Sequence, residues 1–265
     1  MKMLYKVIVS IREDGVVSTA KKILFYPIAR IKKAERKKRR LRFEREALSL
    51  ESVEERFTWI YENNKWGEAE SVSGPGSTIS HTKSLRRNLP HLVKRYRIRS
   101  MLDAPCGDFN WMKCVLAKLN VNYIGGDIVN SLIARNRKEF ASEKVRFIKI
   151  DIINDELPSA DLMICRDCLF HFCHADIVRF LHNFISSHIT YLLTTSYVLQ
   201  LGEENKDILT GEFRVLDLRA EPYGFPEPIE FIDDYLAPGR ERYMMLWSRD
   251  QISEIFGCLP RCDTS

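Results

Sequence analysis

The sequence predicts an open α/β fold: a mostly parallel twisted sheet with helices on both faces and a late antiparallel pair of strands. Three observations lead to this prediction. From about Ser84, apolar runs of strand length alternate with helical patterns, which is typical of a parallel sheet. Three of these runs end in an aspartate. After Thr195 the Gly and Pro content rises, and two more extended segments follow.

The first 55 residues are predicted to form a basic, partly helical arm, which leaves residues 56–265 for the α/β domain. Within the arm, residues 6–11 fit a short strand, and the apolar spacing over residues 23–31 fits a helix. Residues 30–45 contain 10 Lys and Arg against two Glu, a local charge of +8 that leaves −3 for the rest of a chain whose total is +5. The basicity therefore belongs to the arm, and the remainder is slightly acidic.

A second helix is predicted over residues 54–65, because Phe57, Ile60 and Tyr61 fall on one of its faces. The segment 71–78 is rich in Gly, Pro and Ser and is predicted to be a loop. Five strands of the sheet are then predicted, at residues 100–104, 122–127, 145–150, 161–165 and 190–195.

The clearest helix of the α/β region covers residues 175–187, where apolar residues recur at i, i+3, i+4, i+7 and i+8. These residues should pack on the sheet as core: Ile177, Phe180, Leu181, Phe184 and Ile185. Two late extended segments, residues 213–218 and 242–247, are the candidates for the antiparallel pair.

The seven cysteines are odd in number and lie on apolar stretches, which favours a reducing compartment over a disulfide framework. No run approaches the roughly 20 apolar residues that a membrane-spanning helix requires. No apolar segment is followed by a small-residue cleavage site either. We therefore expect a cytoplasmic protein.

The most informative stretch, residues 101–111, is an apolar strand that breaks into a glycine turn before a helix. In open α/β sheets ligands bind beyond the carboxyl ends of strands at such a turn, and an acid about 20 residues further on can bind ribose hydroxyls. Asp127 has that spacing from Gly107, and Asp151 ends the next strand, where an adenine ring would lie. Each acid alone could be a structural strand-end or cap residue. Three in register, counting Asp103, favour a nucleotide site.

The first turn lacks the G-x-G-x-x-G pattern of dinucleotide sites. Pro105 removes a backbone donor and Asp108 adds negative charge, and both are unfavourable to a pyrophosphate at a helix N-terminus. S-adenosylmethionine has no phosphate and presents an ammonium, a carboxylate and a sulfonium cation, so acids such as Asp103 and Asp108 are compatible with it. The turn therefore favours S-adenosylmethionine over NAD.

Four motifs stand at the predicted strand ends: Asp-Ala-Pro-Cys-Gly-Asp-Phe-Asn-Trp at residues 103–111, Tyr-Ile-Gly-Gly-Asp at 123–127, Asp-Ile at 151–152 and the run at 160–171. With these motifs the chain resembles the bacterial class I methyltransferases that are often found with surface-polysaccharide genes. The resemblance extends from about Phe57 to about Ser248. The arm and the tail are not covered by it.

The resemblance implies a Rossmann-like class I methyltransferase fold with S-adenosyl-L-methionine as cofactor. It implies an acceptor hydroxyl, or a phosphate-type oxygen, on a surface glycan or its precursor. It also implies cofactor-binding residues at four strand ends: Asp103 and Gly107 near the methionine moiety, Asp127 on the ribose, Asp151 and Ile152 at the adenine, and Arg166 lining the same cleft.

Methyl transfer from a sulfonium is an in-line displacement on an activated electrophile, so alignment of the acceptor supplies most of the acceleration. A base adds about 10²- to 10⁴-fold for a hydroxyl acceptor. His171 is the preferred base because its ordinary pKa lies near neutrality. Asp167 is the second choice, as base or as the group that orients His171. The alternative for His171 is a hydrogen-bonded structural histidine.

Two further motifs leave alternatives open. The spacing of Cys165, Cys168, His171 and Cys173 suggests zinc, but a structural zinc site usually draws ligand pairs from loops and Cys165 is expected at a buried strand end. We therefore predict no metal. The segment 73–77 is either a nest of backbone N–H groups for an anionic acceptor or cofactor carboxylate, or a plain lid or linker.

The basic run at residues 30–45 is most often explained as a solvated helix. Of the more specific alternatives, docking on an anionic membrane surface is preferred over binding RNA phosphates, because apolar residues precede the run. Three function classes remain: a methyltransferase acting on a small-molecule or glycan hydroxyl, an RNA methyltransferase, and a non-catalytic membrane-surface binding protein with the same fold. The acidic body argues against a nucleic-acid partner. An NAD-dependent oxidoreductase is a more distant fourth.

Overall fold

The computed structural model describes residues 35, 38, 40–235 and 239–256, and the chain divides into two units, Met1–Ser49 and Leu50–Ser265. In the first unit residues 40–46 are helical, and exposed ion pairs join Arg40 to Glu44 and Arg42 to Glu46. The predicted strand at 6–11, the helical pattern at 23–31 and part of the basic run lie outside the described residues. Within the described part of the chain, no helix has the length and apolar character needed to cross a membrane.

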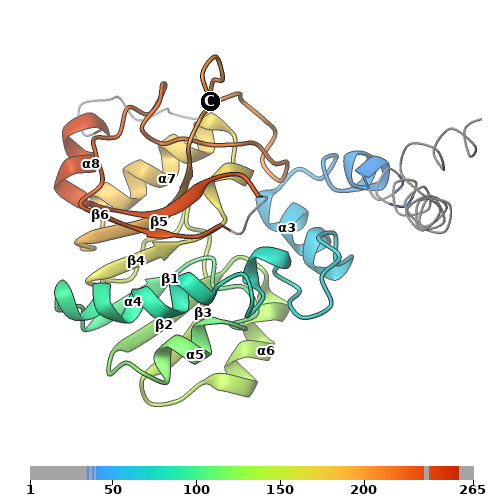
Figure 1. The fold of residues 1–265 in the computed structure, drawn as a ribbon. Coiled ribbons are helices and arrows are strands. Elements are labelled where there is room, and N and C mark those ends of the chain that lie inside the picture. The colour runs from blue at the N-terminus through green and yellow to red at the C-terminus, as the bar shows by residue number, and fades with distance from the viewer. Residues whose placement is uncertain (1–34, 36–37, 39, 236–238, 257–265) are drawn as a thin grey trace, which may run out of the picture. The chain divides into compact units, whose positions relative to one another are not determined.

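The second unit is built on a seven-stranded sheet of strand order β3-β2-β1-β4-β5-β7-β6 (Figure 1). The first five strands pair in parallel and confirm the predicted ones to within two residues. Their bounds are β1 (Ser100–Asp103), β2 (Asn122–Asp127), β3 (Val145–Lys149), β4 (Leu162–Cys165) and β5 (Tyr191–Tyr197). The last two are β6 (Glu230–Asp233) and β7 (Arg242–Ser248), and β7 runs antiparallel to both of its neighbours.

Alternate residues of the central strands enter two different hydrophobic cores. Leu102 and Met163 belong to one core, whereas their chain neighbours Met101 and Leu162 belong to the other. Successive side chains of a strand point to opposite faces of the sheet, so each apolar strand serves both cores. This explains why the strands read as continuous apolar runs in the sequence.

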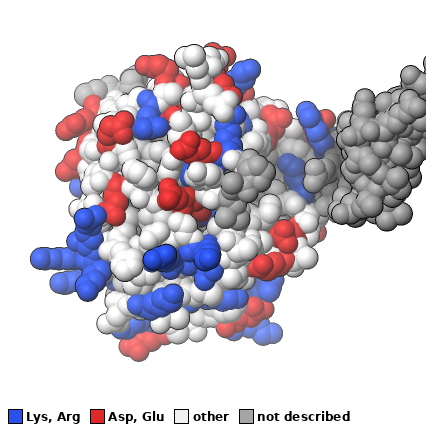
Figure 2. Space-filling model, viewed as in Figure 1, with Lys and Arg blue, Asp and Glu red and all other residues white. Residues whose placement is uncertain are grey.

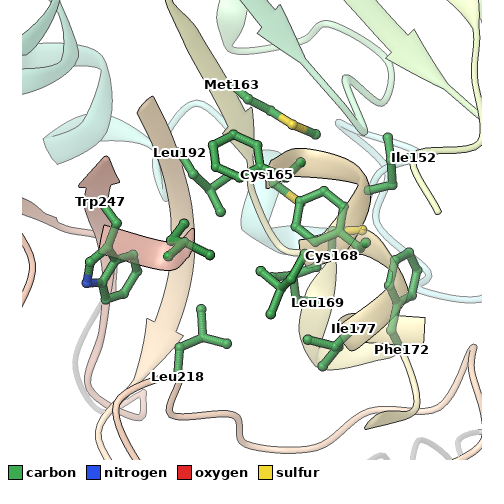
Figure 3. Close-up of a cluster of buried hydrophobic side chains, with 14 of the residues drawn as sticks. Ile152, Met163, Cys165, Cys168, Leu169, Phe172, Ile177, Leu192, Leu218 and Trp247 are labelled. Atoms are coloured by element: carbon green, nitrogen blue, oxygen red, sulfur yellow. The ribbon is translucent and has the colours of Figure 1, made fainter. Parts of the chain in front are cut away.

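Helices close the two cores on opposite faces of the sheet, as predicted (Figure 1). One face carries α7 (His174–Ser186) and α8 (Arg249–Phe256), and the other carries α4 (Lys83–Arg95), α5 (Met112–Leu116) and α6 (Asn130–Phe140). The predicted helix at 175–187 is confirmed as α7, and its Ile177 lies beside Leu169 in the core that also contains Leu192 (Figure 3).

The predicted strand at residues 213–218 is wrong, although two of its apolar residues are fully buried. Leu216 and Leu218 are core residues, and Figure 3 shows Leu218 near Trp247, but the segment has no regular structure. The position beside β7 is taken by β6, with Ile232 opposite Met244. The late antiparallel pair is therefore confirmed, with a different partner strand.

Two local features place chain segments at the carboxyl edge of the sheet. Helix α3 (Val53–Glu62) begins with a capping box, in which Ser52 and Glu55 satisfy each other's backbone N–H groups. From this helix Phe57 packs edge-on against Phe172, with ring centroids 6.1 Å apart. The predicted loop at 71–78 is confirmed except for one 3₁₀ turn, Pro75–Ser77.

Candidate functional site

A cavity of about 360 Å³ lies beyond the carboxyl ends of β1 to β4. It lies where the strand order reverses between β1 and β4, which is where open α/β sheets bind ligands. All of the residues predicted for the site line it: Asp103, Gly107, Asp127, Asp151, Ile152, Arg166, Asp167 and His171. The structure therefore brings together, around one cavity, residues that are spread over 69 positions of the sequence.

Asp103, the last residue of β1, is almost fully buried in the wall of the cavity. Burial raises the pKa of its carboxyl to about 7, although the hydroxyl of Tyr123 donates a hydrogen bond of 2.7 Å to Oδ2 and favours the charged form. The carboxyl of Asp103 is therefore close to half ionised at neutral pH, and a cation beside it would complete the ionisation.

Gly107 and Asp127 are joined directly. The backbone N–H of Gly107 donates to Oδ2 of Asp127 at 3.1 Å, and the N–H of Val129 donates to Oδ1 at 3.0 Å. Burial raises the pKa of Asp127 to about 6 against these two donors. Each carboxylate oxygen can accept a second hydrogen bond, so Asp127 keeps capacity for a ligand hydroxyl. Gly107 adopts φ +54, a left-handed conformation that favours glycine.

Asp151 and Ile152 follow β3 and form the next part of the cavity wall. Asp151 organises the turn after the strand, because Oδ1 accepts the N–H of Ile153 at 2.9 Å and Oδ2 accepts the side-chain amide of Asn154 at 2.7 Å. Ile152 is buried beside it. A carboxylate and an apolar surface are thus held together in the cavity wall.

Asp108 ties the loop at 71–73 to the first turn. Its carboxylate accepts the hydroxyl of Ser71 and the N–H of Val72, each at 3.0 Å, and its own N–H donates to Ser73 Oγ at 2.9 Å. A Cβ on Gly107 would stand 2.2 Å from that same Oγ. In the sequence Asp108 counted only as compatible with a cationic cofactor; in the structure its carboxylate binds the loop and does not line the cavity.

The same loop has few N–H groups left for an anion. Val72 donates to Asp108, Ser73 to the hydroxyl of Ser71, and Gly74 and Ser77 to backbone carbonyls within the loop. The nest alternative for residues 73–77 is thus contradicted, and the segment is a wall of the cavity.

A network of two arginines and two aspartates forms the part of the site beyond β4. Arg166 holds Asp234 through Nε (2.9 Å) and Nη2 (3.0 Å), and Nη2 also donates to the carbonyl of Gly76. Arg242 holds Asp167 at 2.8 Å and Asp234 at 3.3 Å. Arg166, Asp234 and Arg242 are buried, so the charges are paired and fixed in place. The sequence did not reveal Asp234 or Arg242, which lie 68 and 75 positions from their partners.

Asp167 is held by guanidinium groups. Burial favours its neutral acid, but Arg166 and Arg242 outweigh burial and keep the pKa of Asp167 below its ordinary value. Such a carboxylate is a weak base, and His171 takes its orienting hydrogen bond from elsewhere. The predicted role of Asp167 in orienting His171 is therefore wrong.

His171 stands in a 3₁₀ turn, Leu169–His171, after β4. Its Nδ1 lies 2.6 Å from the carbonyl oxygen of Glu212, which assigns the ring proton to Nδ1 and leaves Nε2 as an acceptor. Burial lowers the pKa of His171 to about 4, so the ring is neutral at pH 7. This is the tautomer that can receive a proton from an acceptor hydroxyl.

Aromatic rings surround His171. The ring centroids of Phe170, Trp66 and Phe213 lie 4.6, 6.0 and 6.0 Å from that of His171, and Tyr197 lies 5.7 Å from Phe170. All of these residues line the cavity. The cavity thus has an acidic part at β1 to β3 and an aromatic part at β4 and β5.

The zinc alternative finds no support in the described part of the chain, which contains no group of three or more His, Cys, Asp and Glu side chains placed to hold a metal ion. Cys165 is fully buried at the end of β4, as expected, and it is a free thiol. Cys258 and Cys262 lie outside the described residues.

No protein-family model and no curated protein matches the chain. Among solved structures, a SAM-dependent methyltransferase from Leishmania major aligns with a TM-score of 0.55 at 14% identity, over 75% of this chain and 87% of that one. The fold is that of class I methyltransferases. PigF with SAH aligns with a TM-score of 0.52 at 10% identity, over 72% of this chain and 61% of PigF.

The predicted Rossmann-like methyltransferase fold is thereby confirmed. Human N-acetylserotonin methyltransferase in complex with SAM has a TM-score of 0.48 and 14% identity over 75% of this chain. This chain spans 56% of the length of that human protein.

Proposed function

We propose that the protein is an S-adenosylmethionine-dependent methyltransferase that transfers a methyl group to an acceptor hydroxyl. One observation carries the proposal: the strand-end residues Asp103, Gly107, Asp127 and Asp151 meet on one cavity of a methyltransferase fold. PigF, which has this fold, is a complex with SAH, and this supports a cofactor of the same kind here.

The chemistry of the cavity wall fits this cofactor better than a dinucleotide. Three carboxylates face the part of the cavity at β1 to β3, and carboxylates favour an ammonium and a sulfonium over a pyrophosphate. We assign Asp103 and Gly107 to the methionine moiety, Asp127 to the ribose hydroxyls, and Asp151 with Ile152 to the adenine. Arg166 lines the cavity, but its guanidinium is occupied by Asp234, so we assign it to holding the segment at Gly76.

The bound cofactor would supply a methyl group already activated by the positive sulfur. The chain's part is then to orient the acceptor and remove its proton. His171 is suited to this because its Nδ1–H is fixed by the carbonyl of Glu212 and its Nε2 is free to accept a proton. Burial lowers the pKa of the ring to about 4, which makes His171 a weaker base than an ordinary histidine, so its proposed role rests on its position and tautomer. The proton would pass on to solvent.

The acceptor class is proposed from the sequence resemblance: a small molecule, a surface glycan or a glycan precursor in the cytoplasm. Docking of residues 30–45 on an anionic membrane surface would suit a lipid-linked precursor. An RNA methyltransferase is less well supported, since Figure 2 shows acidic and basic side chains interspersed on the visible face rather than one positive surface.

Calorimetric titration tests the proposal. The full chain should bind S-adenosylmethionine and not NAD. Asp127→Ala should weaken binding about 10- to 100-fold, the value of one or two hydrogen bonds to a charged group. Asp233→Ala is the matched control, because Asp233 is an exposed strand-end aspartate outside the cavity. Preferential binding of NAD, or equal affinities of the two variants, would refute the assignment.

A further inference from the structure

The aromatic part of the cavity contains rings that the protein leaves open. Phe213 is 56% exposed although it lines the cavity, and Trp66 is only partly buried. Large exposed aromatic side chains that border a cavity are typical of binding surfaces. Gly74 packs closely against Trp66, since a Cβ at Gly74 would stand 3.2 Å from Cβ of Trp66. These two rings form a wall that a ligand can cover.

The charges beside this wall are balanced. The guanidiniums of Arg166 and Arg242 face the carboxylates of Asp167 and Asp234 at 2.8 to 3.3 Å. Arg242 additionally donates to the carbonyl of Asp234, so its donors are largely used. Charge on Arg that is already paired gives little attraction to a further anion.

The charge balance of the whole cavity also disfavours an anionic acceptor. Among the described residues, its lining contains four aspartates, Asp103, Asp127, Asp151 and Asp167, against two arginines. A phosphate or carboxylate acceptor would enter this field without a free cation to meet it. An uncharged acceptor would not be repelled.

We infer that the acceptor is an uncharged hydroxyl compound that lays the flat face of a ring against Trp66 and Phe213. This inference rests on the proposed function. The hydroxyl would point to Nε2 of His171, whose ring centroid is 6.0 Å from both aromatic rings. The acceptor oxygen forms a bond to the methyl carbon while the carbon–sulfur bond breaks. The electron pair of that bond stays on sulfur, and Nε2 of His171 takes the hydroxyl proton.

The shared chemistry is a ring with a flat C–H or π face, a hydroxyl and no charge. An aryl alcohol and a pyranose both have it, and both stack on aromatic side chains. A phosphate ester that leaves a hydroxyl free on the same ring differs from the uncharged compound mainly in charge, which makes it a matched probe for the charge argument.

The experiment measures ring-proton saturation transfer by NMR with the full chain saturated with S-adenosylhomocysteine. The probes are 4-methoxyphenol, methyl α-D-glucopyranoside, 4-hydroxyphenyl phosphate and α-D-glucose 1-phosphate at equal millimolar concentration. At least one uncharged ring should receive saturation, and its phosphate ester should receive at least fivefold less. The stronger of the two uncharged probes distinguishes an aryl from a sugar acceptor.

Variants locate the binding surface. Trp66→Ala and Phe213→Ala should each reduce the saturation of the preferred ring about fivefold or more, and Trp66→Phe should restore most of it. Phe231→Ala is the matched control, since Phe231 is 57% exposed on β6 and lies outside the cavity. Affinity for S-adenosylhomocysteine should be the same in all four variants, which shows that they are folded.

Saturation of neither uncharged ring, equal or stronger saturation of a phosphate ester, or insensitivity to both alanine variants would overturn the inference. Failure of the proposed function would be distinguishable, because the protein would then not bind S-adenosylhomocysteine at all.

Discussion

The ionisation of Asp103 should control the affinity for a cationic cofactor. The side chain is 2% exposed, and burial raises its pKa to about 7, from 3.8, despite the hydrogen bond from Tyr123. Only the charged carboxylate attracts an ammonium or sulfonium. The cofactor should therefore bind to the ionised form of Asp103, so that binding releases a proton. Its affinity should fall as the pH drops through 7.

The magnitude follows from the pKa values of the two aspartates that line the cavity at β1 and β2. With a pKa of about 7, Asp103 is about 9% ionised at pH 6 and about 91% at pH 8, so the affinity should rise about tenfold, or about 1.4 kcal/mol. Asp127, with a pKa of about 6, adds about a factor of two over the same interval. Both pKa values are raised in the folded state. Protonated Asp103 and Asp127 therefore add most to the free energy of unfolding of the ligand-free protein below about pH 4. This added stability is lost as the pH rises to about 7.

Calorimetry at pH 6, 7 and 8, in buffers of different ionisation enthalpy, measures both the affinity and the protons released. Asp103→Asn should bind S-adenosylmethionine more weakly and lose all but about twofold of the pH dependence. S-adenosylhomocysteine has no sulfonium charge and should show a smaller dependence. Tyr123→Phe should move the midpoint up by about one pH unit, the value of a hydrogen bond to a charged group. A parent affinity that is constant from pH 6 to pH 8 would refute the reasoning.

Three further predictions concern other parts of the chain. His171→Ala should lower kcat about 10²- to 10⁴-fold with unchanged affinity for S-adenosylmethionine, and an unchanged kcat would eliminate His171 as the base. Asp108→Ala removes the hydrogen bonds that hold the loop at 71–73 and should lower the free energy of unfolding by about 2 kcal/mol. The melting temperature should then fall by about 4–8 °C. An unaltered melting curve would mean that the loop does not need these hydrogen bonds. Reversing the charges of residues 36–40 should abolish co-sedimentation with anionic vesicles and leave cofactor binding intact, and persistent co-sedimentation would discard the docking hypothesis.

The parallel strands and the residues at their ends could be predicted because their signals are local. Apolar runs of strand length that end in Asp103 and Asp127 appear in the sequence as they appear in the sheet. The error at residues 213–218 has a physical cause. Leu216 and Leu218 are buried like strand residues, whereas β6 has only Phe231 and Ile232 as apolar residues and gives a weak signal.

The contacts between distant segments could not be predicted. The role of Asp108 depends on a loop 35 to 37 positions earlier, and the role of Asp167 depends on Arg242, which lies in β7. In a sequence, an aspartate does not indicate whether its carboxylate will face a ligand, a loop or a guanidinium. Only the fold decides between these: Asp127 lines the cavity, whereas Asp108 binds the loop at 71–73.

The segment at 71–77 is attached to the rest of the protein on both sides of the cavity. Asp108, in the turn after β1, accepts a hydrogen bond from the N–H of Val72. Arg166, after β4, donates one to the carbonyl of Gly76. Because this segment is one wall of the cavity, the two attachments hold that wall to the ends of two neighbouring strands of the sheet. We therefore expect the wall to keep its shape while ligands enter and leave the cavity.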